Sequence, residues 1–274
     1  MKMILYISLI LSLFSCKKNK TEILNLNNNR IDVLGHAGMG ISSLYPINSG
    51  ESLLACLYSG ANGTEIDVQL TKDNVLVAFH DNTLDDKTNL SGIIREHNWS
   101  DLAEGTYNST PYLGYKLVKI NDLFNNLENF QNYIFTFDIK INPSSSESID
   151  DYLDDYTDAI LTLYSVYDIH SHSFIEAQYT PFIMLLASKD AQIKQFIYPQ
   201  VFEDGLSIAQ ELNLFGITIS NDKINMEQVK VAHDQGYFVT IWGPNSNSSN
   251  EDAVSKSPDM IQTDKLNHLI KHLE

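Results

Sequence analysis

Acidic and apolar side chains alternate in the segment Thr-Glu-Ile-Asp-Val-Gln-Leu at residues 64–70. In a β-strand every second side chain points to the same face, so Glu65 and Asp67 share the interior face and the apolar residues share the other. Two neighbouring carboxylates inside a protein repel one another strongly unless a cation joins them. This segment therefore predicts a buried strand that carries part of a cation site.

A second segment, residues 133–140, repeats this arrangement. Its phenylalanines alternate with polar residues, which places Asp138 and Lys140 on the interior face near the end of a strand. Glu65, Asp67 and Asp138 together form a set of oxygen ligands suited to one hard divalent ion, either Ca²⁺ or Mg²⁺. Two acids separated by one residue are common on strands without any metal, so the interpretation depends on their surroundings.

Two histidines are candidates for acid–base chemistry. His36 follows the apolar segment 31–34, and His80 follows the strand-like segment 75–79. Barrel enzymes carry their catalytic groups at such strand ends. Imidazole exists in both protonation states near neutral pH, so a pair of histidines can serve as base and acid within one reaction cycle. We therefore predict His36 and His80 as the catalytic pair.

The elements that must position these residues follow a βα pattern from residue 30 onward. Strands are predicted at residues 31–34, 64–70, 133–140, 166–170, 182–187, 215–220, 238–242 and 260–263, and helices at 51–59, 120–130, 148–164, 204–213, 225–235 and 265–273. This spread favours an α/β fold, a closed (β/α)8 TIM barrel that forms a single domain over residues 30–274. Residues 75–79 should fold back on the second strand as a hairpin, residues 81–115 should form an irregular insertion at the barrel mouth, and residues 245–250 should be a loop.

The composition fits one such domain and argues against nucleic acid as a partner. The chain has 274 residues, of which 43% are hydrophobic, and barrels of about this length commonly form one domain. The formal net charge of -17 at pH 7 repels polyanions. An anionic substrate therefore needs local positive charge, such as a metal ion or Lys140. No G-x-G-x-x-G motif follows the first strand, so a dinucleotide-binding fold has no support.

The N-terminus has the pattern of an export signal. A lysine and an apolar stretch precede Leu-Phe-Ser-Cys at residues 13–16. We predict that residues 1–15 are a lipoprotein signal peptide, that Cys16 is lipidated, and that residues 16–29 are a flexible tether. The protein would then be exported and lipid-anchored to a bacterial membrane, in the periplasm or at the outer membrane. An ordinary cleaved signal is the alternative. Cys56 is predicted to be a small core residue.

Five motifs follow one another in a fixed order before residue 82. They are Gly-His-Ala-Gly at 35–38, Pro-Ile-Asn at 46–48, Glu-Ile-Asp at 65–67, Thr-Lys-Asp at 71–73 and Val-Ala-Phe-His-Asp at 77–81. This order resembles G-H-R-G, P-E-N, E-x-D, T-x-D and V-x-x-H-D of the glycerophosphodiester phosphodiesterase family. Residues 138–140, 239–242 and 259–264 are similar to its acidic-x-Lys strand, its late tryptophan strand and its closing D-G-I-I-T-D. The resemblance covers nearly all of residues 31–266.

The resemblance implies a barrel of the phospholipase C-like phosphodiesterase type that hydrolyses glycerophosphodiesters to glycerol phosphate and an alcohol. It also implies that the metal binds a phosphate oxygen, while one histidine takes a proton from the nucleophile and the other protonates the departing alkoxide. The sequence assigns neither role, and it leaves open whether the nucleophile is water or a substrate hydroxyl. Lys140 is expected to contact the phosphate. Trp242 is expected to form an apolar wall for the glycerol or head group, with a plain core position as the alternative.

Two positions depart from the family pattern. Ala37 stands where the family usually has arginine, which removes a bidentate phosphate clamp, and Ile47 stands where it has glutamate. Two other functions therefore stay open: a lipid-anchored protein that binds phosphodiesters with little or no cleavage, and a phospholipase D-like transphosphorylation that gives a cyclic phosphate. His170 and His172 could contact the substrate, although surface or loop positions are more common for such residues. No protein partner is implied.

Overall fold

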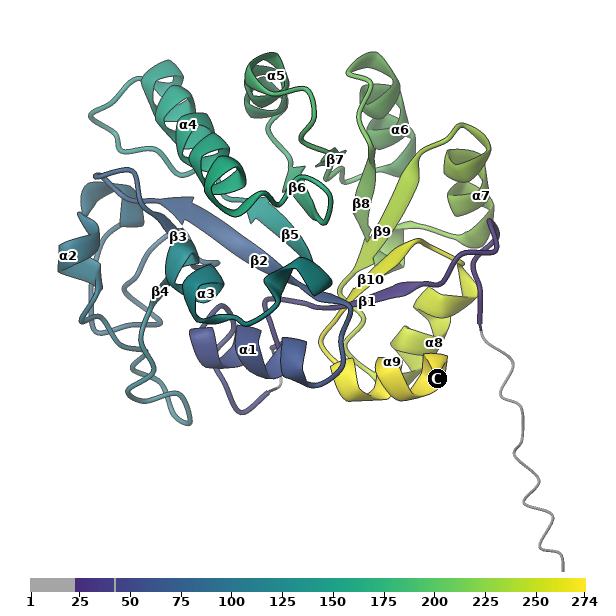
Figure 1. The fold of residues 1–274 in the computed structure, drawn as a ribbon, viewed down its shortest axis with the longest axis horizontal. Coiled ribbons are helices and arrows are strands. Elements are labelled where there is room, and N and C mark those ends of the chain that lie inside the picture. The colour runs from purple at the N-terminus through teal and green to yellow at the C-terminus, as the bar shows by residue number, and fades with distance from the viewer. Residues whose placement is uncertain (1–22, 42) are drawn as a thin grey trace, which may run out of the picture.

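The computed structural model describes residues 23–41 and 43–274 (Figure 1). The predicted signal peptide and Cys16 lie outside these residues. Parallel strands form a closed barrel, because β1 pairs with both the last strand and β2. The barrel strands are β1 (Asp32–Gly35), β2 (Gly63–Leu70), β5 (Ile134–Ile139), β6 (Ser173–Ala177), β7 (Gln195–Ile197), β8 (Gly216–Ser220), β9 (Phe238–Trp242) and β10 (Met260–Thr263). The predicted barrel is confirmed.

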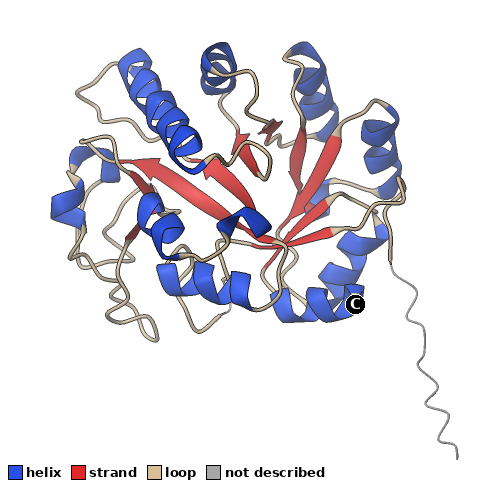
Figure 2. Ribbon diagram, in the orientation of Figure 1, coloured by secondary structure: helices blue, strands red, loops and turns tan. Residues whose placement is uncertain are grey.

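Helices surround the barrel on its outside (Figure 2). They are α1 (Gly50–Tyr58), α3 (Ile120–Asn126), α4 (Ile149–Tyr167), α5 (Thr180–Lys189), α6 (Phe202–Glu211), α7 (Met226–Asp234), α8 (Asn247–Ser255) and α9 (Leu266–Leu273). The outward residues Ile66, Val68 and Leu70 are buried in one core with Leu53 of α1 and Tyr156 of α4. The alternation in β2 therefore sorts its apolar side chains toward the helices, as predicted. Within the described part of the chain, no helix is long and apolar enough to cross a membrane.

The predicted hairpin and insertion lie on one side of the barrel (Figure 1). The strand β3 (Leu76–Ala78) pairs antiparallel with β2, and β4 (Val118–Lys119) pairs with β3. Between them lie the 3-10 turn η1 (Ile94–Glu96) and the short helix α2 (Trp99–Leu102), around a small apolar core of their own. Arg95, which is 7% exposed, joins this insertion to the barrel through Glu147 and Asp155.

The predictions of strands at residues 166–170 and 182–187 are wrong. Residues 166 and 167 form the end of α4, which stops where Asp168 adopts a left-handed conformation. Residues 182–187 lie within α5, which has Pro181 in its first turn. Their β-branched and aromatic side chains resemble a buried strand, but tertiary packing decides between helix and strand for short apolar segments. The loop predicted at 245–250 is also wrong in part, because Ser246 caps α8 from Asn247 onward.

The segment before β1 is held against the amino-terminal end of the barrel. The buried Asn25 side chain donates to Oδ1 of Asp259, 3.0 Å away, and accepts from the backbone N–H groups of Asn27 and Asn29. Part of the stretch expected to be a tether therefore forms a turn on the domain. Because this turn lies before β1, it lies at the end of the barrel opposite the carboxyl ends of the strands.

Candidate active site

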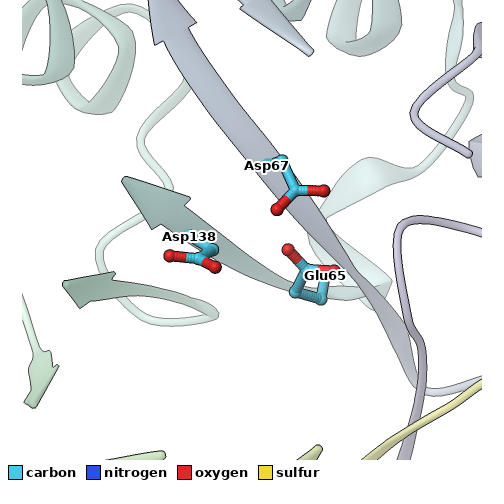
Figure 3. Close-up of side chains that lie close together, drawn as sticks. All are labelled: Glu65, Asp67 and Asp138. Atoms are coloured by element: carbon cyan, nitrogen blue, oxygen red, sulfur yellow. The ribbon is translucent and has the colours of Figure 1, made fainter. Parts of the chain in front are cut away.

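The three predicted metal ligands lie together at the interior of the barrel. Glu65 and Asp67 come from β2 and Asp138 from β5, and one carboxylate oxygen of each lies within 4.8 Å of the others. Figure 3 shows the carboxyl groups pointing toward one another. The parallel register places Asp67 directly opposite Asp138. All three side chains are buried, so their mutual repulsion is only weakly screened by solvent.

The carboxylate of Glu65 has one oxygen that is available to bind a cation. Its Oε2 accepts a hydrogen bond from the backbone N–H of Ala37 at 2.7 Å, whereas its buried Oε1 has no hydrogen-bond partner among the described residues. Burial, and then the charges of Asp67 and Asp138, raise the pKa of Glu65 well above its ordinary value. A divalent ion would partner Oε1 and relieve this repulsion, so the donor set fits a hard metal.

Lys140 supplies a fixed positive charge beside the acidic cluster. Its Nζ lies 2.9 Å from Oδ1 of Asp67 and 2.6 Å from Oδ2 of Asp138. Burial would raise the pKa of Asp67, but Lys140 and then His80 outweigh it, so this pKa is lowered. Burial would likewise lower the pKa of Lys140, but the two carboxylates outweigh it and raise it. Lys140 therefore stays protonated beside the acidic cluster.

His36 is held by a carboxylate that directly follows the last strand of the barrel. Its Nδ1 lies 3.0 Å from Oδ1 of Asp264, which also accepts a hydrogen bond from the backbone N–H of Ile41. Gly40 allows the loop backbone before Ile41 to pass close to Asp264, because its φ is +83° and a Cβ there would lie 2.4 Å from Cα of Asp264. Burial would lower the pKa of His36, but the hydrogen bond and charge of Asp264 outweigh it and raise it. Since a carboxylate only accepts, the proton stays on Nδ1 and Nε2 is left for chemistry.

His80 is held in the same way at the edge of the site. Its Nδ1 lies 2.7 Å from Oδ1 of Asp81, and its side chain is 51% exposed. The preceding residue, Phe79, donates its backbone N–H to the carbonyl of Asp67, which places His80 beside the acidic cluster. Each predicted catalytic histidine is therefore oriented through Nδ1 by a carboxylate, and each lies within electrostatic reach of Asp67.

Asn48 is a site residue whose role was not predicted. Its side chain is buried, donates to Oδ2 of Asp67 at 2.6 Å and accepts from the backbone N–H of Asp67 at 3.0 Å. The neighbouring Ala37, at the position of the family arginine, is buried and has a positive φ of 49°. Asn48 thus fixes one predicted ligand, while Ala37 adds a backbone donor and no charge.

Trp242 lies beside His36, one of the two predicted catalytic histidines. Its ring centre is 5.9 Å from that of His36 and 5.4 Å from that of Tyr198, and its buried Nε1 has no partner among the described residues. This position favours a wall of the site over a plain core role. The alternative that His170 and His172 contact the substrate is wrong, because both precede β6 at the opposite end of the barrel.

Glu176 is a buried acid that the sequence analysis missed. It lies on β6 directly opposite Asp138 and accepts a hydrogen bond from Nε2 of Gln262 at 2.7 Å. Burial raises its pKa to about 8. Because a strand was predicted at residues 166–170 and not at 173–177, Glu176 was not assigned to the barrel interior. The alternation in Phe-Ile-Glu-Ala at residues 174–177 is the signal that could have revealed it.

Comparisons with known proteins agree with this geometry. Residues 39–268 match the glycerophosphoryl diester phosphodiesterase family. A glycerophosphodiester phosphodiesterase from Bacillus altitudinis is 39% identical over 69 residues, and one from Caldanaerobacter subterraneus is 42% identical over 60 residues. These matches cover 25% and 22% of this chain and 28% and 25% of those relatives, so each spans only about a quarter of the relative.

Solved structures share the fold at low identity. A putative glycerophosphoryl diester phosphodiesterase from Silicibacter pomeroyi superposes with a TM-score of 0.78 at 16% identity, covering 89% of this chain and 93% of that one. An Oleispira antarctica phosphodiesterase, solved with the product sn-glycerol-3-phosphate, gives a TM-score of 0.74 at 18% identity, covering 88% and 95%. The family match spans most of the barrel, and this chain therefore belongs to the glycerophosphoryl diester phosphodiesterase family.

Proposed function

We propose that this protein is a metal-dependent enzyme that hydrolyses glycerophosphodiesters to glycerol phosphate and an alcohol. The observation that carries the proposal is the buried cluster of Glu65, Asp67 and Asp138, with an unpartnered oxygen on Glu65, beside two imidazoles. The sn-glycerol-3-phosphate bound to the Oleispira antarctica phosphodiesterase is consistent with this reaction.

In this proposal the acidic cluster, Lys140 and Trp242 each have a separate role in the reaction. A divalent ion held by the three carboxylates, Ca²⁺ or Mg²⁺, would offset the negative charge of the phosphoryl group. Lys140 contributes a second positive charge and orients the phosphate, a role that matters more because Ala37 adds none. Trp242 limits the space for the substrate beside His36.

The two histidines supply the proton transfers. Both present Nε2, because Asp264 and Asp81 hold their Nδ1 atoms. One imidazole accepts the proton of the nucleophile and the other returns a proton to the departing alkoxide. A positioned acid or base of this kind contributes roughly 10²- to 10⁴-fold in rate.

The purified protein, assayed with glycerophosphocholine for release of glycerol phosphate, tests the proposal. We expect turnover that a chelator abolishes and that His36→Ala and His80→Ala each lower by roughly 10²- to 10⁴-fold. His172→Ala is the matched control, since it removes a histidine at the other end of the barrel. Full turnover with chelator or in either histidine variant would refute the mechanism. Binding without cleavage would point to a binding protein, and a cyclic phosphate product to transphosphorylation.

We also propose that the protein is exported and lipid-anchored to a bacterial membrane through Cys16, a proposal that rests on the sequence pattern alone. Expression in a bacterial host, followed by fractionation, tests it. The wild-type chain should pellet with membranes and take up labelled fatty acid, and Cys16→Ala should do neither. Unlabelled, freely released wild-type protein would instead indicate an ordinary cleaved signal.

A further inference from the structure

A cavity of about 290 Å³ opens beside His80, between the loop at residues 43–47 and the insertion. Its walls are mainly apolar and aromatic, and they include Ile47, Phe79, Tyr107 and Tyr112. The cavity begins at a predicted catalytic side chain, so it is placed to receive one of the two substituents of a phosphodiester. Its chemistry therefore bears on which diesters the site accepts.

The tyrosine hydroxyl groups in this cavity are already engaged. The hydroxyl of Tyr107 donates to the carbonyl of Ile47 at 3.0 Å, and that of Tyr112 donates to the carbonyl of Ser43 at 3.1 Å. These bonds fasten the insertion to the opposite loop. The rings are left to form the walls, with Phe79 and Tyr107 in contact at 6.4 Å between ring centres.

The charges at the rim disfavour a cationic head group in this cavity. Asp81 is the acidic lining residue, and its carboxylate is shared between Nδ1 of His80 at 2.7 Å and Nζ of Lys87 at 3.7 Å. A quaternary ammonium group would meet the ammonium of Lys87 and a carboxylate that is already balanced. Two charges of opposite sign at the rim give little net attraction for a cation.

Apolar residues continue from the cavity toward solvent. Ile41 lines the cavity and is 59% exposed, and Leu113, next to Tyr112, is 64% exposed. Ile47, partly exposed in the wall, adds a further aliphatic side chain to this surface. Ile41, an exposed apolar side chain in the lining, therefore makes the mouth of the cavity suited to an apolar group.

We propose that this cavity binds an apolar chain on the substrate, so that the preferred substrates are amphiphilic phosphodiesters of the lysophospholipid type rather than small, fully polar diesters. This inference rests on the proposed phosphodiesterase function and narrows its substrate class. The chain would lie on the His80 side of the phosphate, between Ile47 and the two tyrosine rings. Each methylene that becomes buried there should raise kcat/KM by up to about fourfold.

The test compares glycerophosphocholine with lysophosphatidylcholines of increasing acyl length, each below its micelle-forming concentration. We expect kcat/KM to rise with chain length and to level off when the cavity is full. In Ile47→Gln the ratio of kcat/KM for the longest chain to that for glycerophosphocholine should fall by roughly tenfold, since a polar amide replaces an apolar wall. Val166→Gln, which changes an exposed apolar residue on α4, should keep the wild-type ratio.

The outcomes separate this inference from the proposed function. Hydrolysis of glycerophosphocholine with no dependence on chain length would overturn the apolar cavity and leave the phosphodiesterase standing. An equal effect of Ile47→Gln on all substrates, with an unchanged melting temperature, would also overturn it. Failure to hydrolyse any diester would overturn the proposed function, and this inference with it.

Discussion

Replacing Asp264 with asparagine should slow catalysis without unfolding the barrel. The asparagine keeps the shape of the side chain, and its Oδ1 can still accept from the backbone N–H of Ile41, as Asp264 does at 3.0 Å. What it loses is the negative charge that lies 3.0 Å from Nδ1 of His36. The change therefore isolates the effect of that charge on His36 from its effect on the loop.

The magnitude follows from the type of contact. A hydrogen bond to a charged group contributes about 1.5–3 kcal/mol. If the charge of Asp264 stabilises the protonated imidazole during turnover, the asparagine keeps a neutral hydrogen bond of about 0.5–1.5 kcal/mol. The difference of about 1–1.5 kcal/mol should lower kcat by roughly 5- to 12-fold, at about 1.4 kcal/mol for each factor of ten. The KM should change much less, because Asp264 contacts His36 and the backbone of Ile41.

The pH dependence of the rate provides a second, independent test of the effect of Asp264 on His36. Burial lowers the pKa of His36, and the hydrogen bond and charge of Asp264 more than reverse this. Without that charge the pKa must fall, so the limb of the pH–rate profile that belongs to His36 should move to lower pH. A purely structural role for Asp264 would lower activity at every pH without moving the limb.

Asp259→Asn provides a matched control, because Asp259 also contacts a histidine, with its Oδ2 2.8 Å from Nε2 of His233 at the far end of the barrel. Steady-state kinetics across pH and thermal unfolding would be measured for both variants. Asp259→Asn should cost stability and leave the limb in place. A kcat for Asp264→Asn within twofold of wild type, with an unmoved limb, would refute the reasoning.

Three further predictions concern stability. Burial raises the pKa of Glu176 to about 8 from an ordinary 4.5, so Glu176→Gln should gain stability over metal-free wild type as pH rises through that window, by up to about 1.4 kcal/mol per unit in chemical denaturation. Arg95→Met leaves the carboxylate of Glu147 without its ion-pair partner. The free energy of unfolding should fall by about 3 kcal/mol, seen as a melting temperature lower by roughly 6–12 °C. Mg²⁺ or Ca²⁺ at a hundredfold excess over its Kd should stabilise wild type by about 2.7 kcal/mol, and Glu65→Gln should lose most of that gain in calorimetry.

Local alternation was enough to predict the acidic cluster. In β2 and β5 the side-chain period of two assigns each residue to one face, and a one-residue shift would bury the carboxylates against the helices. Neighbouring parallel strands then bring Asp67 and Asp138 opposite each other without any further information. The barrel was predictable for the same reason, since alternating elements spread over the whole chain leave few other ways to bury their apolar faces.

The residues that hold the site side chains in place were not predictable from local patterns. Asp264 is 228 residues away from His36, and Asn48 is 19 residues from Asp67 in an irregular loop. The short strands β6 and β7 were missed because a fully buried strand of a few residues has the same composition as a buried helical turn. The cavity beside His80 depends on how the insertion packs back on the loop at residues 43–47, which only tertiary contacts determine.

The charges at the site imply an order of binding. Glu65, Asp67 and Asp138 can together carry three negative charges against the one positive charge of Lys140, and Ala37 adds nothing where an arginine would have helped. The whole chain is also strongly negative, at -17. A phosphodiester anion would thus be repelled from the cation-free cluster at low effective dielectric. Under the proposed metal dependence, we expect the metal ion to bind before the substrate, and the affinity for the anion to depend on the metal more steeply here than in a site that keeps the arginine.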